Sequence, residues 1–595
     1  MIQTKESAQH IIWDLSDLFN DINDPEIKKI CTESPVKAEK FAQKYKDKIN
    51  TLSAKNLTKA FQEYEEILLN IYKLSQYSSL NSAIDTQCDD YKALRSTIDS
   101  LSSSVSNTLV FFSLEIAQLS KEHITHLDLT NSCKNYYYYI TEQQKNVTYK
   151  LSEDAEKIAT IKNISGKNGY KKLYSELVAS FEFEFKIDGK IEKLNGTQLR
   201  NLRYHHDAKV RRSAMKTFYK RYEDNQLIIL HIFNNLYKDF NSEREHRGYK
   251  TPISVRNIGN NLSEKAVDNL HNVTTESNSL VQRYYKIKAH ILDLPDLSLA
   301  DIYAPMPDSN TTFTYDEAKS IVLEGFKAFD DDFYSYAKAM FDENRIHAPV
   351  LPKKRGGAFC SGYTPDIKPY VMLNFMGKPR DVSTMAHELG HAIHDMFASK
   401  QTLINYHPIL PLAETASVFS EMVITDLLLK KVSDNKTKQV ILTEKLEDIF
   451  ATSHRQNMFS CFEKDAHALA TNQLPTIQDY CNIYKKQLKT MFGTAVKIPT
   501  EYQWEWSTIP HFIDFPFYVY AYNFGNLLVM ALYQQYKEEG KAFIPKLKKC
   551  LAAGSVTDPK TITRYFDVDI EDPSFWRKSI VYIESLITEL EQLVT

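Results

Sequence analysis

The sequence predicts a mainly α-helical protein with little β-structure. Residues that break helices are scarce, with 16 glycines and 20 prolines among 595 residues, so long stretches can stay helical. Apolar residues recur at three- and four-residue spacing along most of the chain, as in FQEYEEILLNIYKLSQYSSL at 61–80. Only two stretches have the pattern of strands, and one of them predicts a small β-sheet just before a helix that carries two histidines.

The first strand-like stretch ends an N-terminal helical region, which we expect to span residues 1–195. Phenylalanines alternate in FEFEFKI at 181–187, and Asp188 and Gly189 then offer a tight turn into a second short strand. This pattern predicts a β-hairpin. Residues 196–595 return to helix and contain the candidate catalytic residues, so we expect them to form a catalytic region.

The second strand-like stretch is GGAFCSGYTPDIKPYVMLNF at 356–375. Its second run, YVMLNF at 370–375, could pair through its edge with an extended peptide. Gly356 and Gly357 would let a neighbouring loop come close to that peptide. We therefore take Gly356, Gly357 and Tyr370 as candidate substrate-binding residues.

The stretch STMAHELGHAIHDMF at 383–397 predicts a helix with a metal-binding face. His387 and His391 are four residues apart, so their imidazoles can reach one ion. Glu388 lies about 100° further round the helix, off the metal but within reach of a water molecule bound to it. This is the His-Glu-x-x-His pattern of zinc peptidases, with the glutamate as general base. The alternative is a solvated polar helix face, since roughly 3% of such chains contain the pattern by chance.

A catalytic zinc ion needs a third protein ligand. His394 is a poor candidate, because a rigid helix cannot easily wrap three positions of one face around a tetrahedral ion. The stretch PLAETASVFSEMVITDLLLKK at 411–431 places Glu414 and Glu421 on one face of an apolar helix, where carboxylates need partners. We expect Glu414 to be the third ligand and Glu421 to orient a zinc histidine through a hydrogen bond. The alternative is that both glutamates meet arginines or solvent.

Taken together, these stretches resemble the thimet oligopeptidase family of zinc metallopeptidases, and most closely its oligoendopeptidase F branch. The resemblance rests on HELGHAIH followed by ETASVFSE at 414–421, and on the longer block from Lys354 to His394. It extends to WDLSDLF at 13–19 and to PHFIDFPFYVYAYNFGN at 510–526. It therefore covers nearly the whole chain.

The resemblance implies a large helical metallopeptidase with a deep substrate channel, one Zn²⁺ per chain, and cleavage of internal bonds in short peptides. By position, His387, His391 and Glu414 match the zinc ligands of the family, and Glu388 matches its general base. A non-catalytic protein that only binds peptides is an alternative. A zinc carboxypeptidase or dipeptidyl carboxypeptidase is another, because Arg355 and Lys378 lie near the active-site block and could hold the terminal carboxylate of a substrate.

The block at 510–526 implies further contacts with the substrate. His511, Tyr518 and Tyr520 match residues with which the family binds its substrate and stabilises the transition state, so we take them as candidate catalytic residues. Tyr522 is a candidate substrate-binding residue. On a helix, Tyr518 and Tyr522 share a face that Tyr520 does not, and the tyrosine that would stabilise the oxyanion stays open.

Composition predicts partners and location. The net charge is −3 and no long run of one sign occurs, so we expect binding neither to nucleic acid nor to a membrane. The seven cysteines include no Cys-x-x-Cys pair, which argues against a disulfide framework and against a thiolate metal site. The first residues, MIQTKESAQHIIWDL, carry charges where a signal peptide needs an apolar core. We expect a cytoplasmic protein that acts on short peptides, and we favour a monomer while leaving the oligomeric state open.

Overall fold

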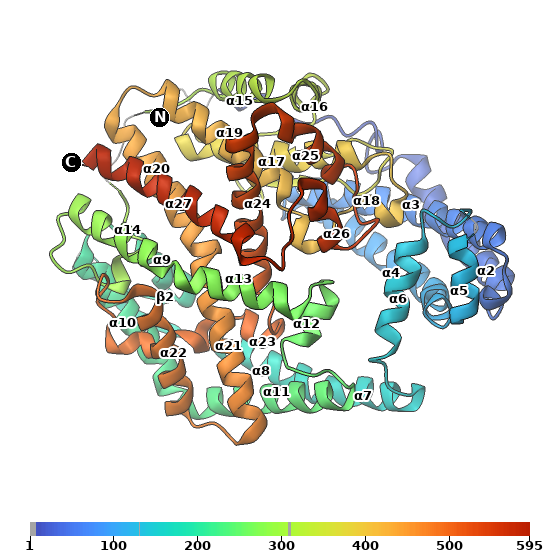
Figure 1. Ribbon diagram of the computed structural model, residues 1–595, viewed down its shortest axis with the longest axis horizontal. Helices are drawn as coiled ribbons and strands as arrows, with labels where there is room; N and C mark the ends of the chain where they lie inside the picture. The colour runs from blue at the N-terminus through green and yellow to red at the C-terminus, as the bar shows by residue number, and fades with distance from the viewer. Residues whose placement is uncertain (1–6, 130, 188, 307–310, 595) are drawn as a thin grey trace. The chain divides into compact units, whose positions relative to one another are not determined.

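The computed structural model describes residues 7–129, 131–187, 189–306 and 311–594 (Figure 1). Helices make up most of these ranges, and the strands form only a two-stranded and a three-stranded sheet. The predicted fold class, mainly α with small sheets, is therefore confirmed. None of the helices in the described ranges combines the length and the apolar character that a membrane-spanning segment needs.

The chain forms two compact units, and each is assembled from three segments. The first unit comprises Met1–Thr148, Thr311–Val432 and Gln535–Asp569. The second comprises Tyr149–Asn310, Ser433–Gln534 and Ile570–Thr595. The predicted division after residue 195, into an N-terminal helical region and a catalytic region, stays a prediction.

Helices dominate the first unit. They are α2 Pro25–Tyr45, α3 Ala54–Ile84, α4 Asp89–Ala117, α5 Lys121–Leu129, α6 Tyr137–Val147, α15 Tyr315–Phe329, α16 Asp331–Asp342, α17 Pro379–Ala398, α18 Leu403–Tyr406, α19 Thr415–Lys431, α25 Ile544–Leu551 and α26 Pro559–Thr563. In one part of the unit, α2, α3 and α4 pack against one another around Phe41, Phe61 and Phe112, whose rings meet edge to face. In another part, α17 packs against α15, α16 and α19.

A three-stranded sheet lies against α17. Its strands are β3 Ile346–His347, β4 Phe359–Ser361 and β5 Tyr370–Met372, in the order β3-β5-β4. β5 pairs in parallel with β3 and antiparallel with β4, so it is the central strand. The prediction that this strand offers an edge to a peptide is therefore wrong, because both of its edges are already paired. Among the described residues, the free edge next to α17 belongs to β4.

The second unit contains the predicted hairpin. β1 Glu182–Ile187 pairs antiparallel with β2 Lys190–Asn195, and Gly189 in the turn has a φ of +84°, which glycine adopts without strain. Residue 188 lies outside the described residues. Phe183 is buried and its ring stacks on Phe218 at 6.0 Å, so the alternating phenylalanines anchor the hairpin. The prediction of a hairpin is confirmed.

The remainder of the second unit is helical. Its helices are α7 Glu153–Ser165, α8 Lys167–Ala179, α9 Gly196–Asn201, α10 Ala208–Asp224, α11 Gln226–His246, α12 Ser254–Gly259, α13 Glu264–Glu276, α14 Asn278–Ile291, α20 Asn435–Thr452, α21 His454–Asn472, α22 Ile477–Phe492, α23 His511–Asp514, α24 Tyr520–Glu539, which ends in the first unit, and α27 Pro573–Val594. α20 packs along α27, and α21 packs on α11, α13 and α22 (Figure 1).

Three buried histidines in this unit make its stability depend on pH. His271 bonds to Ser460, His454 to Ser277, and burial lowers the pKa of both imidazoles to about 3. His467 is buried likewise, with a pKa lowered to about 3. The unfolded chain takes up protons on these groups near pH 6.5, whereas the folded chain does not, so stability falls as pH falls from about 6.5 toward 3.

We expect the melting temperature to drop as the pH falls from 7 to 5, because each of these buried histidines then lowers the free energy of unfolding by on the order of 2 kcal/mol. His454→Gln should reduce this drop, whereas replacing the exposed His231 with glutamine should leave it unchanged. The measurement is thermal melting of the wild-type protein and of the two variants across this pH range. Equal drops in all three would contradict the assignment.

Candidate active site

The helix that carries the two candidate histidine ligands, α17, is held in place by contacts at its start and along its apolar side. Pro379 occupies its first turn, where a missing N–H costs nothing. The carboxylate of Asp381 accepts hydrogen bonds from the backbone N–H groups of Met376 and Lys378, both at 2.9 Å, which satisfies donors at the start of the helix. The apolar side of α17 is fully buried, so the helix is firmly anchored.

A glycine sets the distance between α17 and α19. A Cβ atom at Gly390 would lie 2.6 Å from the carbonyl oxygen of Ala416 and 2.6 Å from Cα of Ser417. These are backbone atoms that cannot rotate away. Gly390 therefore permits the close approach of the two helices, which brings Glu414, the residue before α19, to the two histidines. We did not single out this residue from the sequence, although a glycine between two ligands inside a helix is costly and needs a reason.

Substituting Gly390 with alanine is expected to separate α17 from α19 and to weaken metal binding at least about tenfold, since the ligands lie on both helices. Overpacking should also lower stability by about 1–3 kcal/mol. The matched control is Gly169→Ala in α8, where the nearest atom to the added Cβ is 3.9 Å away. Metal titration and thermal melting are the measurements. Unchanged metal affinity in the Gly390 variant would refute this role.

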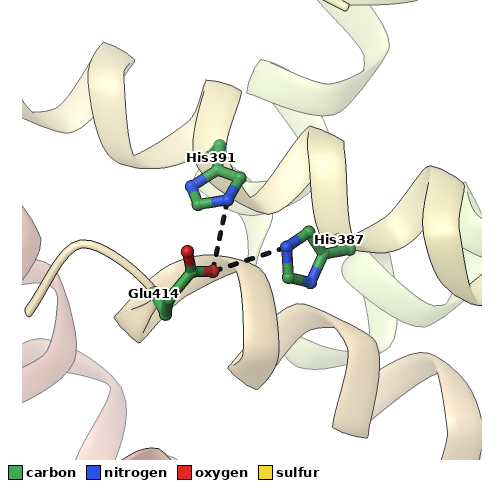
Figure 2. A group of neighbouring side chains, drawn as sticks. All are labelled: His387, His391 and Glu414. Atoms are coloured by element: carbon green, nitrogen blue, oxygen red, sulfur yellow. Dashed lines mark ion pairs between the residues drawn. The ribbon is translucent and has the colours of Figure 1, made fainter. Parts of the chain in front are cut away.

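The three candidate metal ligands lie together. Oε2 of Glu414 is 3.4 Å from Nε2 of His387 and 3.3 Å from Nε2 of His391. Figure 2 shows the two imidazoles on α17 reaching the same carboxylate oxygen. Ligand atoms held tetrahedrally at 2.0–2.1 Å from an ion lie roughly 3.3–3.4 Å apart, so the spacing suits a small cation such as Zn²⁺.

Ligand atoms of these three side chains lie within 4.8 Å of one another, and no other such group of three or more occurs among the described residues. Two further side chains orient them. Oε2 of Glu421 lies 3.3 Å from Nδ1 of His387, so an N–H at this position leaves Nε2 free for a metal. The hydroxyl of Ser417 donates a 2.8 Å hydrogen bond to Oε2 of Glu414. The structure thus brings all four predicted residues of the metal centre together.

The charges in the group are complementary. Burial opposes ionisation of Glu414, but hydrogen bonds from His387 and His391 outweigh it and hold the pKa of this carboxyl well below its usual range. Burial opposes protonation of His387, but its contacts with Glu414 and Glu421 raise the pKa of the imidazole to about 10. The carboxylate and the two imidazoles form a donor set for a cation, which would displace the proton from His387 because a metal ligand must be deprotonated.

Glu388 lies beside this group in a cavity of about 490 Å³. The cavity is lined by β4 and the residues around it, by α17, and by the segment before α19: Ala358, Phe359, Cys360, Gly362, His387, Glu388, His391, His394, Asp395, His407, Pro408 and Ala413. The side chain of Glu388 is only 7% exposed, and the backbone N–H of Cys360 slightly favours the ionised form of its carboxylate. Burial raises its pKa, although the neighbouring histidines oppose the shift.

Asp395 is a second carboxylate in this cavity, which we did not identify from the sequence. It follows Glu388 by seven residues, so both lie on the same face of α17, and this spacing was the available signal. Burial raises the pKa of Asp395 to about 7, although His391 opposes the shift.

The predicted residues of the C-terminal block belong to the second unit, whereas the metal ligands belong to the first. His511, Tyr518 and Tyr522 form a cluster of their own. The rings of Tyr518 and Tyr522 are 5.3 Å apart, and the Tyr522 hydroxyl lies 3.5 Å from Nε2 of His511. Tyr522 is 41% exposed. Tyr522 is therefore accessible for contact with a ligand, and the half-buried His511 and Tyr518 lie beside it.

Tyr520 lies apart from this cluster. It is fully buried, and its hydroxyl accepts a 2.9 Å hydrogen bond from the side-chain amide of Asn260. Burial raises the pKa of its hydroxyl. Because this group is enclosed and already has a partner, the geometry favours the other three side chains for contact with a substrate.

The predicted substrate-binding residues near the sheet differ in their surroundings. Gly356 and Gly357 precede β4 and have no atoms within 4 Å of the position of a Cβ, so space is open beside them. Tyr370 is fully buried between Trp13 and Arg345, whose guanidinium lies 5.0 Å from its ring centre. The side chain of Tyr370 is thus part of the core, and we do not include it in the proposed substrate site.

Comparisons with known proteins identify the family of this chain. Residues 201–582, more than half of the chain, match the model of Peptidase family M3. The chain belongs to Peptidase family M3. This membership confirms the predicted class of enzyme, a metalloendopeptidase. Residues 115–183 of this M3 peptidase also match a model described as Oligopeptidase F.

Relatives of this M3 peptidase confirm the predicted resemblance to oligoendopeptidase F. It is 26% identical to an oligoendopeptidase F homolog of Borreliella burgdorferi, with 100% of both chains covered. It is also 26% identical to oligopeptidase PepF of Bacillus subtilis, over 93% of this chain and 83% of the relative.

Solved structures share its fold. A crystal structure from Chlamydophila abortus has a TM-score of 0.88 at 23% identity and covers 98% of each chain. Oligoendopeptidase-F from Enterococcus faecium has a TM-score of 0.68 at 23% identity, with 96% of this chain and 97% of that chain covered.

Proposed function

We propose that this M3 peptidase is a zinc-dependent endopeptidase that hydrolyses internal bonds of short oligopeptides. The observation that carries the proposal is the group of His387, His391 and Glu414, whose spacing suits a tetrahedral ion, beside a buried Glu388 in the same cavity. The names of its relatives, oligoendopeptidase F and oligopeptidase, support the choice of short peptides as substrates.

One Zn²⁺ per chain would be held by Nε2 of His387, Nε2 of His391 and Oε2 of Glu414. When bound, it would supply a Lewis acid that activates water at neutral pH and polarises the scissile carbonyl. Glu421 would keep the His387 imidazole in the tautomer that presents Nε2. Ser417 would keep the Glu414 carboxylate in place through its hydrogen bond.

Glu388 would act as the general base. Its carboxylate would accept a proton from the attacking water and then return it to the leaving amine. Burial in the cavity, with the backbone N–H of Cys360 nearby, would limit the movement of this carboxylate. Its raised pKa suits the second step, because a more basic carboxylate holds the proton until the amine needs it.

The substrate would lie extended along β4. This strand lines the cavity, and its outer edge is free among the described residues, so it can accept a peptide by strand addition. Gly356 and Gly357 leave open space at the start of this strand. His511, Tyr518 and Tyr522 are proposed to bind the substrate or stabilise the oxyanion, with Tyr520 as the less favoured candidate.

Cleavage of a quenched fluorogenic peptide of about eight residues, blocked at both ends, tests this function. The reaction is run with and without a zinc chelator, and the products are identified by mass. Internal cleavage that the chelator abolishes is the expected result. Zinc binding without cleavage would point to one of the alternatives: a carboxypeptidase-type enzyme would cut the same peptide only when its C-terminus is free, and a non-catalytic peptide-binding protein would cut neither. A cytoplasmic location and a monomeric state stay predictions.

A further inference from the structure

The cavity beside the proposed metal ligands contains a carboxylate that has no role in the proposed reaction. Asp395 lines this cavity, yet its carboxylate has no hydrogen bond and no salt bridge among the described residues. It also belongs to no group of side chains that could hold a metal ion within the described ranges. Enclosing an unpaired carboxylate is costly, and a cationic partner removes this cost.

The chain makes room for this side chain. A Cβ at Gly362, one residue after β4, would lie 2.0 Å from Oδ2 of Asp395 and 3.2 Å from the hydroxyl of Tyr406. Any larger residue at this position would displace the carboxylate. The glycine thus keeps a space in which Asp395 can lie against the strand along which the substrate would extend.

The histidines of the cavity do not neutralise Asp395. His387 and His391 are directed at Glu414. Burial lowers the pKa of His394 to about 3 and also lowers the pKa of His407, so both imidazoles are neutral at pH 7. These four imidazoles therefore leave the position beside Asp395 open to a cation from outside the protein, which would replace the proton that burial otherwise favours on this carboxyl.

Asp395 lies at a useful distance from the general base. Seven residues of α-helix separate it from Glu388, which corresponds to about 10 Å along the same face. An extended peptide rises about 3.3 Å per residue, and lysine and arginine carry their charge at the end of a long stem. A basic residue one or two positions from the scissile bond can therefore bring its cation to Asp395 while the scissile carbonyl remains at Glu388.

We propose that Asp395 is a specificity-determining residue that binds a lysine or arginine side chain of the substrate close to the scissile bond. This inference rests on the proposed peptidase function and adds to it the chemical class of the preferred substrate. Asp395 would select the peptide and would take no part in proton transfer.

Cleavage of a matched peptide series tests the proposal. All peptides are acetylated at the N-terminus and amidated at the C-terminus. One test residue, which is lysine, arginine, norleucine or glutamate, is placed in turn at each of the three positions on either side of the scissile bond. The rest of the peptide is unchanged. At one position, kcat/KM for lysine and arginine should exceed that for norleucine about tenfold or more, and glutamate should be the poorest. Asp395→Asn should bring this ratio close to one. Asp342→Asn, which removes a charge paired with Lys338 on the surface of α16, should leave it unchanged.

A binding experiment separates this proposal from the proposed function. Calorimetry with zinc-loaded Glu388→Gln protein should show tighter binding of the lysine peptide than of the norleucine peptide, and adding Asp395→Asn should remove the difference. The assignment is overturned if wild-type protein prefers a basic residue at no position, or if the ratio survives in Asp395→Asn. A preference that requires a free α-amino group would overturn it as well, because the cation would then be the peptide N-terminus. Selective binding without any cleavage would refute the proposed peptidase function but not the proposed role of Asp395.

Discussion

Glu388→Gln is expected to lower kcat by about 10²–10⁴-fold without loss of bound zinc. The amide cannot accept a proton from water, whereas it has nearly the same size and shape as the carboxylate that it replaces. Packing of the buried side chain is therefore kept, and the ligands on α17 and before α19 are untouched. The measurements are kcat with the fluorogenic peptide and the zinc content of the purified protein.

The control for this substitution is Glu324→Gln, which removes a surface carboxylate paired with Lys431 and should change kcat little. Retention of most activity in the Glu388 variant, with zinc bound, would exclude this residue as the base. A joint loss of zinc and activity would instead show that the substitution disturbs the metal ligands.

Glu414→Ala is expected to abolish stoichiometric zinc binding and, with it, cleavage. Two imidazoles alone leave the cation without the one carboxylate that lies 3.3–3.4 Å from both of them. Glu414 is also the negatively charged member of the proposed ligand set, so its removal would take away the charge that offsets the ion. Zinc content after dialysis against a fixed concentration of free zinc is the measurement.

Glu421→Ala provides a graded comparison, because Glu421 touches His387 but is not itself a proposed ligand. Its loss should weaken zinc binding by about 10–100-fold and leave a site that fills at higher zinc concentration. The expected order of affinity is wild type, then Glu421→Ala, then Glu414→Ala. Full zinc occupancy in Glu414→Ala at a concentration that leaves Glu421→Ala empty would exclude Glu414 as a ligand.

Much of the candidate metal centre could be predicted because its geometry is local. His387 and His391 belong to one helix, so four-residue spacing alone brings them to one face. The prediction of Glu414 was less direct, because this residue lies on a different segment of the chain. The need for a third ligand and the cost of a buried carboxylate nevertheless pointed to it. The β-hairpin was predictable for the same reason as the histidine pair, because the strands and their turn are adjacent in sequence.

The errors and omissions have non-local causes. β5 is central because it pairs in parallel with β3, a strand of two residues that carries no alternating pattern. Tyr520 is buried, and the residue that donates a hydrogen bond to its hydroxyl, Asn260, is remote in sequence. Asp395 gains its importance from Gly362 and from the cavity, and neither can be seen in the spacing of helix residues.

The position of Cys360 beside Glu388 would also affect how a peptide binds along β4. The backbone N–H of Cys360 favours the ionised form of the Glu388 carboxylate, so the two groups attract each other. A peptide laid along β4 would compete with Glu388 for this donor, and the main-chain ladder would be weakest beside the proposed base. Backbone pairing would then contribute less to affinity at this point, and discrimination between peptides would rest on side-chain pockets.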